Sequence, residues 1–127
     1  MKRLRMGKKF NKQSLHDYHC TEIFRKPYLV VNEGIIWKAK NLEYIIGSQN
    51  GEIDVLLISK DKAHIIEYKC NNDISVKSVI QLDRAALFVE KNFKQTPLLY
   101  HVSFDPRKDQ YLITSIDGIR CNYGKKE

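Results

Sequence analysis

Three charged residues stand in or beside apolar segments in the middle of the chain. Asp54 lies in the run at 53–58, and Glu67 and Lys69 lie in and directly after the run at 64–68. A charge in a buried strand is costly unless it is paired or binds a cation. Side chains alternate along a strand, so Glu67 and Lys69 point to one face, which Asp54 on a neighbouring strand can reach. Two carboxylates and an ammonium at one spot can hold a divalent metal beside a phosphodiester.

Two adjacent strands and a following helix must position these side chains. The polar link Ser59-Lys60-Asp61-Lys62 between the apolar runs predicts a tight connection. A later segment has apolar residues at spacings of three and four, which predicts a helix: Val79, Leu82, Ala86, Val89 and Phe93. This helix should return the chain as a strand parallel to the preceding one.

The expected elements follow in chain order. They are a helix at 15–25, a short turn at 27–31, strands at 35–39 and 42–46 joined by Lys40-Asn41, a loop at 47–51, strands at 53–58 and 64–68, a helix at 76–92, a break at Thr96-Pro97, a strand at 98–104, a helix from 105 to 117 and a last strand at 119–123. Strands that alternate with helices late in the chain favour the α/β class with a mixed sheet.

Capping residues set the expected helix boundaries. Ser14 with Asp17 resembles a capping box for the first helix. Asp73 or Ser75 can cap the second helix. Asp105-Pro106 would place a proline at the first position of a third helix, where its missing N–H costs nothing.

Composition limits the classes of protein to consider. The chain has 127 residues and 43% hydrophobic residues, enough for one domain with a real core. No apolar run approaches the length of a membrane span, and no signal segment follows the basic N-terminus, so we expect a cytoplasmic protein without membrane contact. Three widely spaced cysteines without CxxC indicate reduced thiols, neither a disulfide framework nor a zinc site. The four histidines form no motif and are interpreted as core or surface residues.

The formal net charge of +7 is concentrated at the N-terminus, where residues 1–9 hold five basic and no acidic residues. We expect residues 1–13 to form a flexible basic arm ahead of a single domain at 14–127. Such an arm suits nucleic acid, although a solvated tail has the same composition. Its candidate phosphate contacts are Lys2, Arg3, Arg5, Lys8 and Lys9.

The pattern Asp54, twelve intervening residues, then Glu67-Tyr68-Lys69 resembles the PD-(D/E)XK nuclease superfamily, in particular the C-terminal nuclease domain of NucS-type mismatch endonucleases. The other matching pieces are Leu42-Glu43-Tyr44, Gly51-Glu52-Ile53-Asp54-Val55-Leu56 and Gln81-Leu82-Asp83-Arg84. The sequence has Ile53 where the superfamily's name has proline, and Ala85 where some relatives have tyrosine. The relatives also carry a separate N-terminal DNA-binding and dimerising domain, for which this chain leaves no room.

The resemblance implies a restriction-endonuclease-like core, a central mixed sheet flanked by helices, and an Mg²⁺ or Mn²⁺ site. Asp54, Glu67 and the backbone carbonyl of Tyr68 would hold the metal. Glu43 could bind through water or hold a second ion, and Glu22, Glu33 or Glu52 could serve instead. Lys69 and Gln81 would act on the attacking water or the phosphate. Lys77 and Arg84 could contact phosphates, or they could simply form a solvated face of the helix.

These observations predict a metal-dependent deoxyribonuclease. Its expected substrate is single-stranded or structured DNA, and its expected setting is DNA repair, recombination or defence. The alternatives are an inactive nuclease-fold DNA-binding module and a small interaction subunit that docks on an acidic partner. Cutting both strands would need two sites, which a homodimer supplies most simply. Its candidate interfaces are the segment 35–39 with Trp37 and the exposed side of the first helix.

Overall fold

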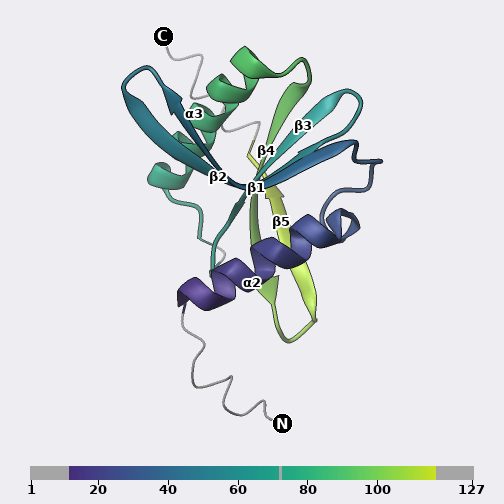
Figure 1. Ribbon diagram of the computed structural model, residues 1–127. Coiled ribbons are helices and arrows are strands. Elements are labelled where there is room, and N and C mark those ends of the chain that lie inside the picture. The colour runs from purple at the N-terminus through teal and green to yellow at the C-terminus, as the bar shows by residue number, and fades with distance from the viewer. Residues whose placement is uncertain (1–11, 72, 117–127) are drawn as a thin grey trace.

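The computed structural model describes residues 12–71 and 73–116. Within them the elements are α2 (Lys12–Arg25), the 3-10 helix η1 (Pro27–Leu29), β1 (Trp37–Ile46), β2 (Gln49–Ile58), β3 (Lys62–Tyr68), α3 (Val76–Asn92), β4 (Thr96–Asp105) and β5 (Gln110–Ser115). The five strands form one sheet in the order β1-β2-β3-β4-β5, with β3 and β4 parallel and the other neighbours antiparallel. Helices α2 and α3 flank this sheet (Figure 1). The expected α/β class with a mixed sheet is confirmed.

Each face of the sheet has its own hydrophobic cluster. One cluster joins strand residues to buried residues of α3, among them Val79, Leu82, Ala86 and Val89. The other joins strand residues to Cys20 and Ile23 of α2. Since β2 and β3 are buried on both faces, they read in the sequence as continuous apolar runs.

Helix α3 has the bounds and the apolar stripe that the sequence predicts. Ser75 is its N-cap, and the Ser75 hydroxyl accepts a hydrogen bond from the backbone N–H of Ser78 at 3.1 Å. The helix connects β3 to the parallel strand β4, as expected. The chain does not break at Thr96-Pro97, because these residues begin β4, where the missing N–H of Pro97 is best tolerated.

The first hairpin differs from the prediction. The turn expected at Lys40-Asn41 is wrong, since β1 is continuous and pairs with β2 in a single register. Asn41 has φ +55°, a left-handed conformation that asparagine tolerates and that also occurs in turns. The chain reverses at Gly47-Ser48, where Gly47 has φ +62°, so the expected loop at 47–51 shortens to a two-residue turn.

The expected helix at 105–117 is also wrong. Residues 106–109 form a turn, and β5 pairs with β4 as a second hairpin. Proline fixes a φ that suits both a helix start and the second position of a turn, so Pro106 does not distinguish them. Asp105 Oδ1 accepts from the N–H of Arg107 at 3.0 Å, and Asp109 closes the turn with φ +53°. The strand expected at 119–123 lies outside the described residues.

Helix α2 already includes Lys12 and Gln13, two residues expected in the arm. Ser14 therefore lies inside the helix, and the capping box predicted there is wrong. On this helix Cys20 and Ile23 are buried, whereas Leu15 and Tyr18 are exposed. The rest of the arm lies outside the described residues, and no described helix is both long and apolar enough to cross a membrane.

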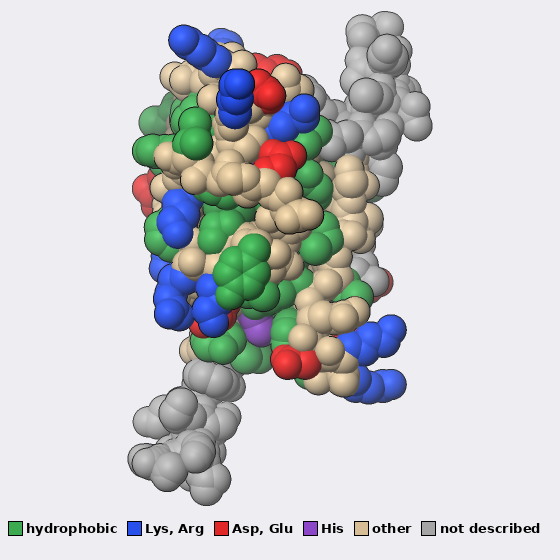
Figure 2. All heavy atoms as spheres, turned by 90° about the vertical axis from the view of Figure 1, so that its right-hand side faces the viewer, with side chains coloured by type: hydrophobic (Ala, Val, Ile, Leu, Met, Phe, Trp, Pro, Cys, Tyr) green, Lys and Arg blue, Asp and Glu red, His purple; other side chains and the backbone are tan. Residues whose placement is uncertain are grey.

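Exposed apolar side chains gather around the segment between α2 and β1. Tyr28 is 71% exposed, Ile36 68% and Trp37 47%. This dark-blue segment lies on the right in Figure 1, the side that Figure 2 shows, where hydrophobic side chains stand among Lys and Arg side chains. A hollow of about 400 Å³ lies here, lined in part by all three residues.

Candidate active site

Asp54 stands where the regular pairing of β2 with β3 ends. The two strands pair from Ile58–Ala63 to Val55–Ile66. Beyond this pair, a side-chain hydrogen bond replaces the backbone pairing: Asp54 Oδ2 accepts from the backbone N–H of Tyr68 at 2.8 Å. Asp54 is only 6% exposed, so this bond helps to offset the cost of burying a carboxylate.

The strand β2 is irregular at Asp54. Ile53 packs in the cluster on the α3 side and Val55 in the cluster on the α2 side, although residues two apart in a regular strand share a face. Asn41, with its positive φ, occupies the corresponding position of β1. The irregularity brings the Asp54 carboxylate to the edge of β3, within reach of side chains from both helices.

Glu67 and Lys69 form an ion pair at the end of β3, with Nζ 3.2 Å from Oε2. The prediction that they point to one face is therefore confirmed. The pKa of Glu67 is raised to about 7, chiefly by burial and also by the negative charge of Asp54, while Lys69 opposes the shift. Without a metal, Asp54 and Glu67 thus repel each other.

A cavity of about 150 Å³ contains both carboxylates. It is lined by residues of β1, β2, β3 and α3: Tyr44, Asn50, Gly51, Glu52, Asp54, Glu67, Gln81 and Arg84. The Oε1 atom of Gln81 is buried and has no hydrogen-bond partner within the described residues. An unpaired buried amide oxygen is costly, so this atom marks a place for a further donor or a cation.

Gly51, which precedes Asp54 in the motif, has a packing role. A Cβ atom here would collide with the ring of Tyr44, which lies across the glycine. Tyr44 in turn stacks on Phe88 of α3, with ring centroids 4.7 Å apart. The glycine therefore lets the outer half of the first hairpin pack on α3 and form one wall of the cavity.

Among the four acidic residues considered beside Asp54 and Glu67, Glu52 is the one that lines the cavity. Glu43 is exposed and stands opposite Glu52 in the β1–β2 register, beside a wider adjoining hollow. Glu22 forms ion pairs with basic residues of its own helix end, and Glu33 bonds to His64. Burial and the charge of Asp54 raise the pKa of Glu52.

The remaining predicted residues are spread more widely. Gln81 and Arg84 line the cavity, whereas Lys77 is exposed on α3. The backbone N–H of Tyr68 contacts Asp54, and a role for its carbonyl as a metal ligand stays a prediction. The basic residues of the arm, Lys2, Arg3, Arg5, Lys8 and Lys9, lie outside the described residues.

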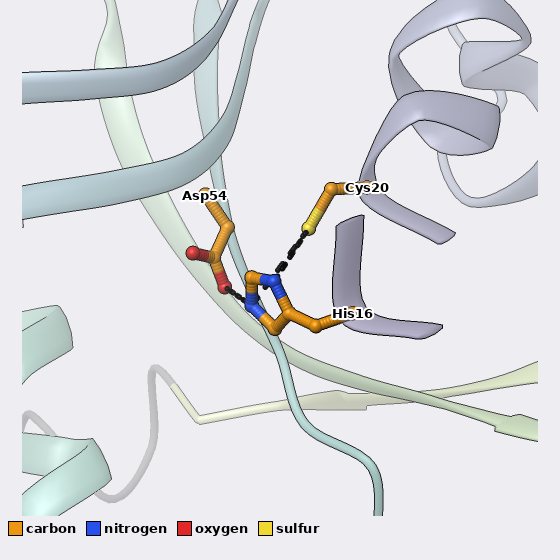
Figure 3. Close-up of side chains that lie close together, drawn as sticks. All are labelled: His16, Cys20 and Asp54. Atoms are coloured by element: carbon orange, nitrogen blue, oxygen red, sulfur yellow. Dashed lines mark hydrogen bonds and ion pairs between the residues drawn. The ribbon is translucent and has the colours of Figure 1, made fainter. Parts of the chain in front are cut away.

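Sequence reasoning missed His16, which approaches Asp54 from α2. Its Nε2 lies 3.1 Å from Asp54 Oδ2, and the Cys20 sulfur lies 3.8 Å from its Nδ1 (Figure 3). The bond to Asp54 raises the pKa of His16 well above its ordinary value, so a positive imidazolium faces the carboxylate. The spacing of His16 and Cys20 by four residues on a helix was a signal that they meet.

No family model matches the chain, and no curated protein matches its sequence.

Proposed function

We propose that this protein is a metal-dependent nuclease that hydrolyses phosphodiester bonds of DNA, with a restriction-endonuclease-like core. The observation that carries the proposal is the cavity lined by Asp54, Glu67 and Gln81, with Lys69 paired to Glu67. The mixed sheet flanked by two helices is the architecture that such a core requires.

The donor set fits Mg²⁺ or Mn²⁺. The cavity offers carboxylate and amide oxygens, which hard cations prefer, and it has room for bound waters. Asp54 and Glu67 would hold the ion, with Glu52 or Glu43 as further acidic groups. When bound, the ion would polarise the phosphate and lower the pKa of an attacking water.

The protein's own side chains have separable tasks in this scheme. Lys69 would stabilise the negative charge that grows on the phosphate during the reaction. Gln81 would position the water through its amide, and Arg84 at the cavity wall would hold the substrate phosphate.

The rival functions are a DNA-binding module without activity and a small interaction subunit. Both leave the burial of two neighbouring carboxylates, those of Asp54 and Glu67, unexplained, because removing such groups from water costs stability. A site kept at such a cost is typical of catalysis.

A panel of single-stranded, flapped, mismatched and junction DNAs, incubated with Mn²⁺ or Mg²⁺, tests the proposal. We expect cleavage that chelator stops and that Asp54→Ala abolishes. DNA binding without cleavage under every condition would favour the inactive module, and absence of both would favour the interaction subunit.

A further inference from the structure

A second group of potential metal ligands lies on the α2 side of Asp54. It consists of an imidazole, a thiol and a carboxylate, those of His16, Cys20 and Asp54 (Figure 3). One ligand atom from each residue can be chosen so that all three lie within 4.8 Å of one another. Cys20 is 1% exposed and Asp54 6%, while the His16 side chain is 26% exposed and leaves one side open.

The separations suit a tetrahedral ion. His16 Nε2 lies 3.1 Å from Asp54 Oδ2 and 3.9 Å from the Cys20 sulfur. Zinc bonds of about 2.0–2.3 Å place neighbouring ligands roughly 3.3–3.8 Å apart, so these two distances differ by less than about half an ångström. The Cys20 sulfur lies within 4.8 Å of an Asp54 carboxylate oxygen. Small side-chain rotations would complete the geometry.

We propose that His16, Cys20 and Asp54 form a binding site for a transition-metal ion of the Zn²⁺ class. Thiolate and imidazole select such ions over Mg²⁺, which prefers oxygen. The ion would replace the protons that now link the three side chains, and a water would complete its coordination from the open side.

Neighbouring groups hold the proposed ligands in place, as a metal site requires. The N–H of Tyr68 donates to Asp54 Oδ2 and fixes the carboxylate from behind. His16 and Cys20 stand one turn apart on α2, and Cys20 is anchored in the cluster between this helix and the sheet.

The site would also regulate the chemistry proposed above, and this part rests on the proposed function. Asp54 belongs to both donor sets, so an ion held by Cys20 and His16 engages a carboxylate that Mg²⁺ needs. Two dications on one carboxylate repel each other. We therefore expect Zn²⁺ to inhibit Mg²⁺-dependent cleavage in the wild type and to inhibit Cys20→Ser at least about tenfold less strongly.

Titration of the full chain with Co²⁺, in the absence of other metals, tests the site. We expect a sulfur-to-cobalt charge-transfer band and the visible bands of tetrahedral Co²⁺. Cys20→Ser should lose the charge-transfer band, and His16→Ala should bind at least about tenfold more weakly. Circular dichroism checks that both variants fold, and His16→Ala, at a partly exposed position, still tests the site if Cys20→Ser does not fold.

Two matched variants complete the design. Cys70→Ser removes an exposed thiol and should keep the band, and Glu67→Gln alters the oxygen site and should keep it too. A band that survives in Cys20→Ser, or Co²⁺ binding that Glu67→Gln abolishes, would overturn the proposal. A wild type that binds Co²⁺ through Cys20 yet never cuts DNA would overturn only the nuclease function.

Discussion

The Asp54 carboxylate connects the two halves of the site. Both of its hydrogen bonds go to Oδ2, from His16 on one side and from the Tyr68 N–H on the other. Within the described residues no hydrogen bond reaches Oδ1, which points away from His16. Oδ2 thus faces α2 and the transition-metal site proposed there, and Oδ1 is left for a second ligand.

Lys69 allows a direct test of catalysis against binding. Lys69→Ala should bind DNA almost as well as the wild type and cut it about 100- to 1,000-fold more slowly, because the ammonium acts on charge that develops in the transition state. Single-turnover cleavage and fluorescence anisotropy measure the two effects separately. Lys60→Ala, at an exposed position in the β2–β3 connection, is the matched control. Parallel losses of binding and cleavage would identify Lys69 as a phosphate clamp.

Glu67 should make stability depend on pH in the metal-free protein. Its pKa is raised from 4.5 to about 7, so between these values the unfolded chain releases the proton and the folded chain keeps it. Its contribution to stability therefore falls as pH rises through this window. Glu67→Gln should be more stable than the wild type above pH 7 by roughly 1–3 kcal/mol, although it loses cleavage. Urea unfolding in chelator at several pH values measures the unfolding free energy of both proteins. The same pH dependence in the wild type and in Glu67→Gln would contradict the prediction.

At the scale of the elements, the first hairpin shapes the site. Its outer half leaves β3 beyond Val55 and packs on α3 through Tyr44 and Phe88. The cavity lies between this hairpin, the end of β3 and α3, so its form depends on the packing of the Tyr44 ring on Gly51.

Gly51→Ala tests this dependence. The added Cβ would collide with Tyr44, so we expect a loss of about 1–3 kcal/mol in unfolding free energy. Gly34→Ala is the control, because a Cβ there meets nothing within 4 Å. Combining Gly51→Ala with Tyr44→Ala should cost less than the sum of the two changes, since the collision disappears. Additive losses would show that the ring does not depend on the glycine.

At the scale of the whole molecule, the apolar residues beside β1 predict self-association. Within the described residues β1 is an edge strand of the sheet, and exposed apolar groups beside an edge favour pairing with another chain. Ile36 and Tyr28 are about 70% exposed there. A two-fold dimer through this surface would supply the second site that cutting a duplex requires.

Light scattering on wild type and Ile36→Asp measures the assembly. We expect a dimer mass for the wild type and a monomer mass for the variant, because a charge in an apolar interface is costly. Ile45→Asp, at an equally exposed isoleucine near the other end of β1, should stay dimeric. A wild-type monomer with and without DNA would contradict the prediction and indicate a nickase or single-strand nuclease.

Local patterns in the sequence determined the middle of the fold. The bounds of α3, a cap at Asp73 or Ser75 and the apolar run of β3 depend on neighbours close in the chain, so they could be predicted directly. The alternation of side chains along a strand also placed Glu67 and Lys69 on one face. The sequence could not show whether Pro106 begins a helix or a turn, because both require the same φ. The pairing of β5 with β4 decided for a turn and a strand.

The tertiary structure alone decided what surrounds Asp54. His16 is 38 residues away along the chain, and its contact with Asp54 exists because α2 packs across β2 and β3. The irregularity of β2 at Asp54 likewise follows from packing on both faces, which no alternation of residue types records. A sequence pattern reports contacts between residues that are close in the chain, within one helical turn or between two consecutive strands. The burial that brings distant polar groups together depends on the whole core, so it appears only once the chain is folded.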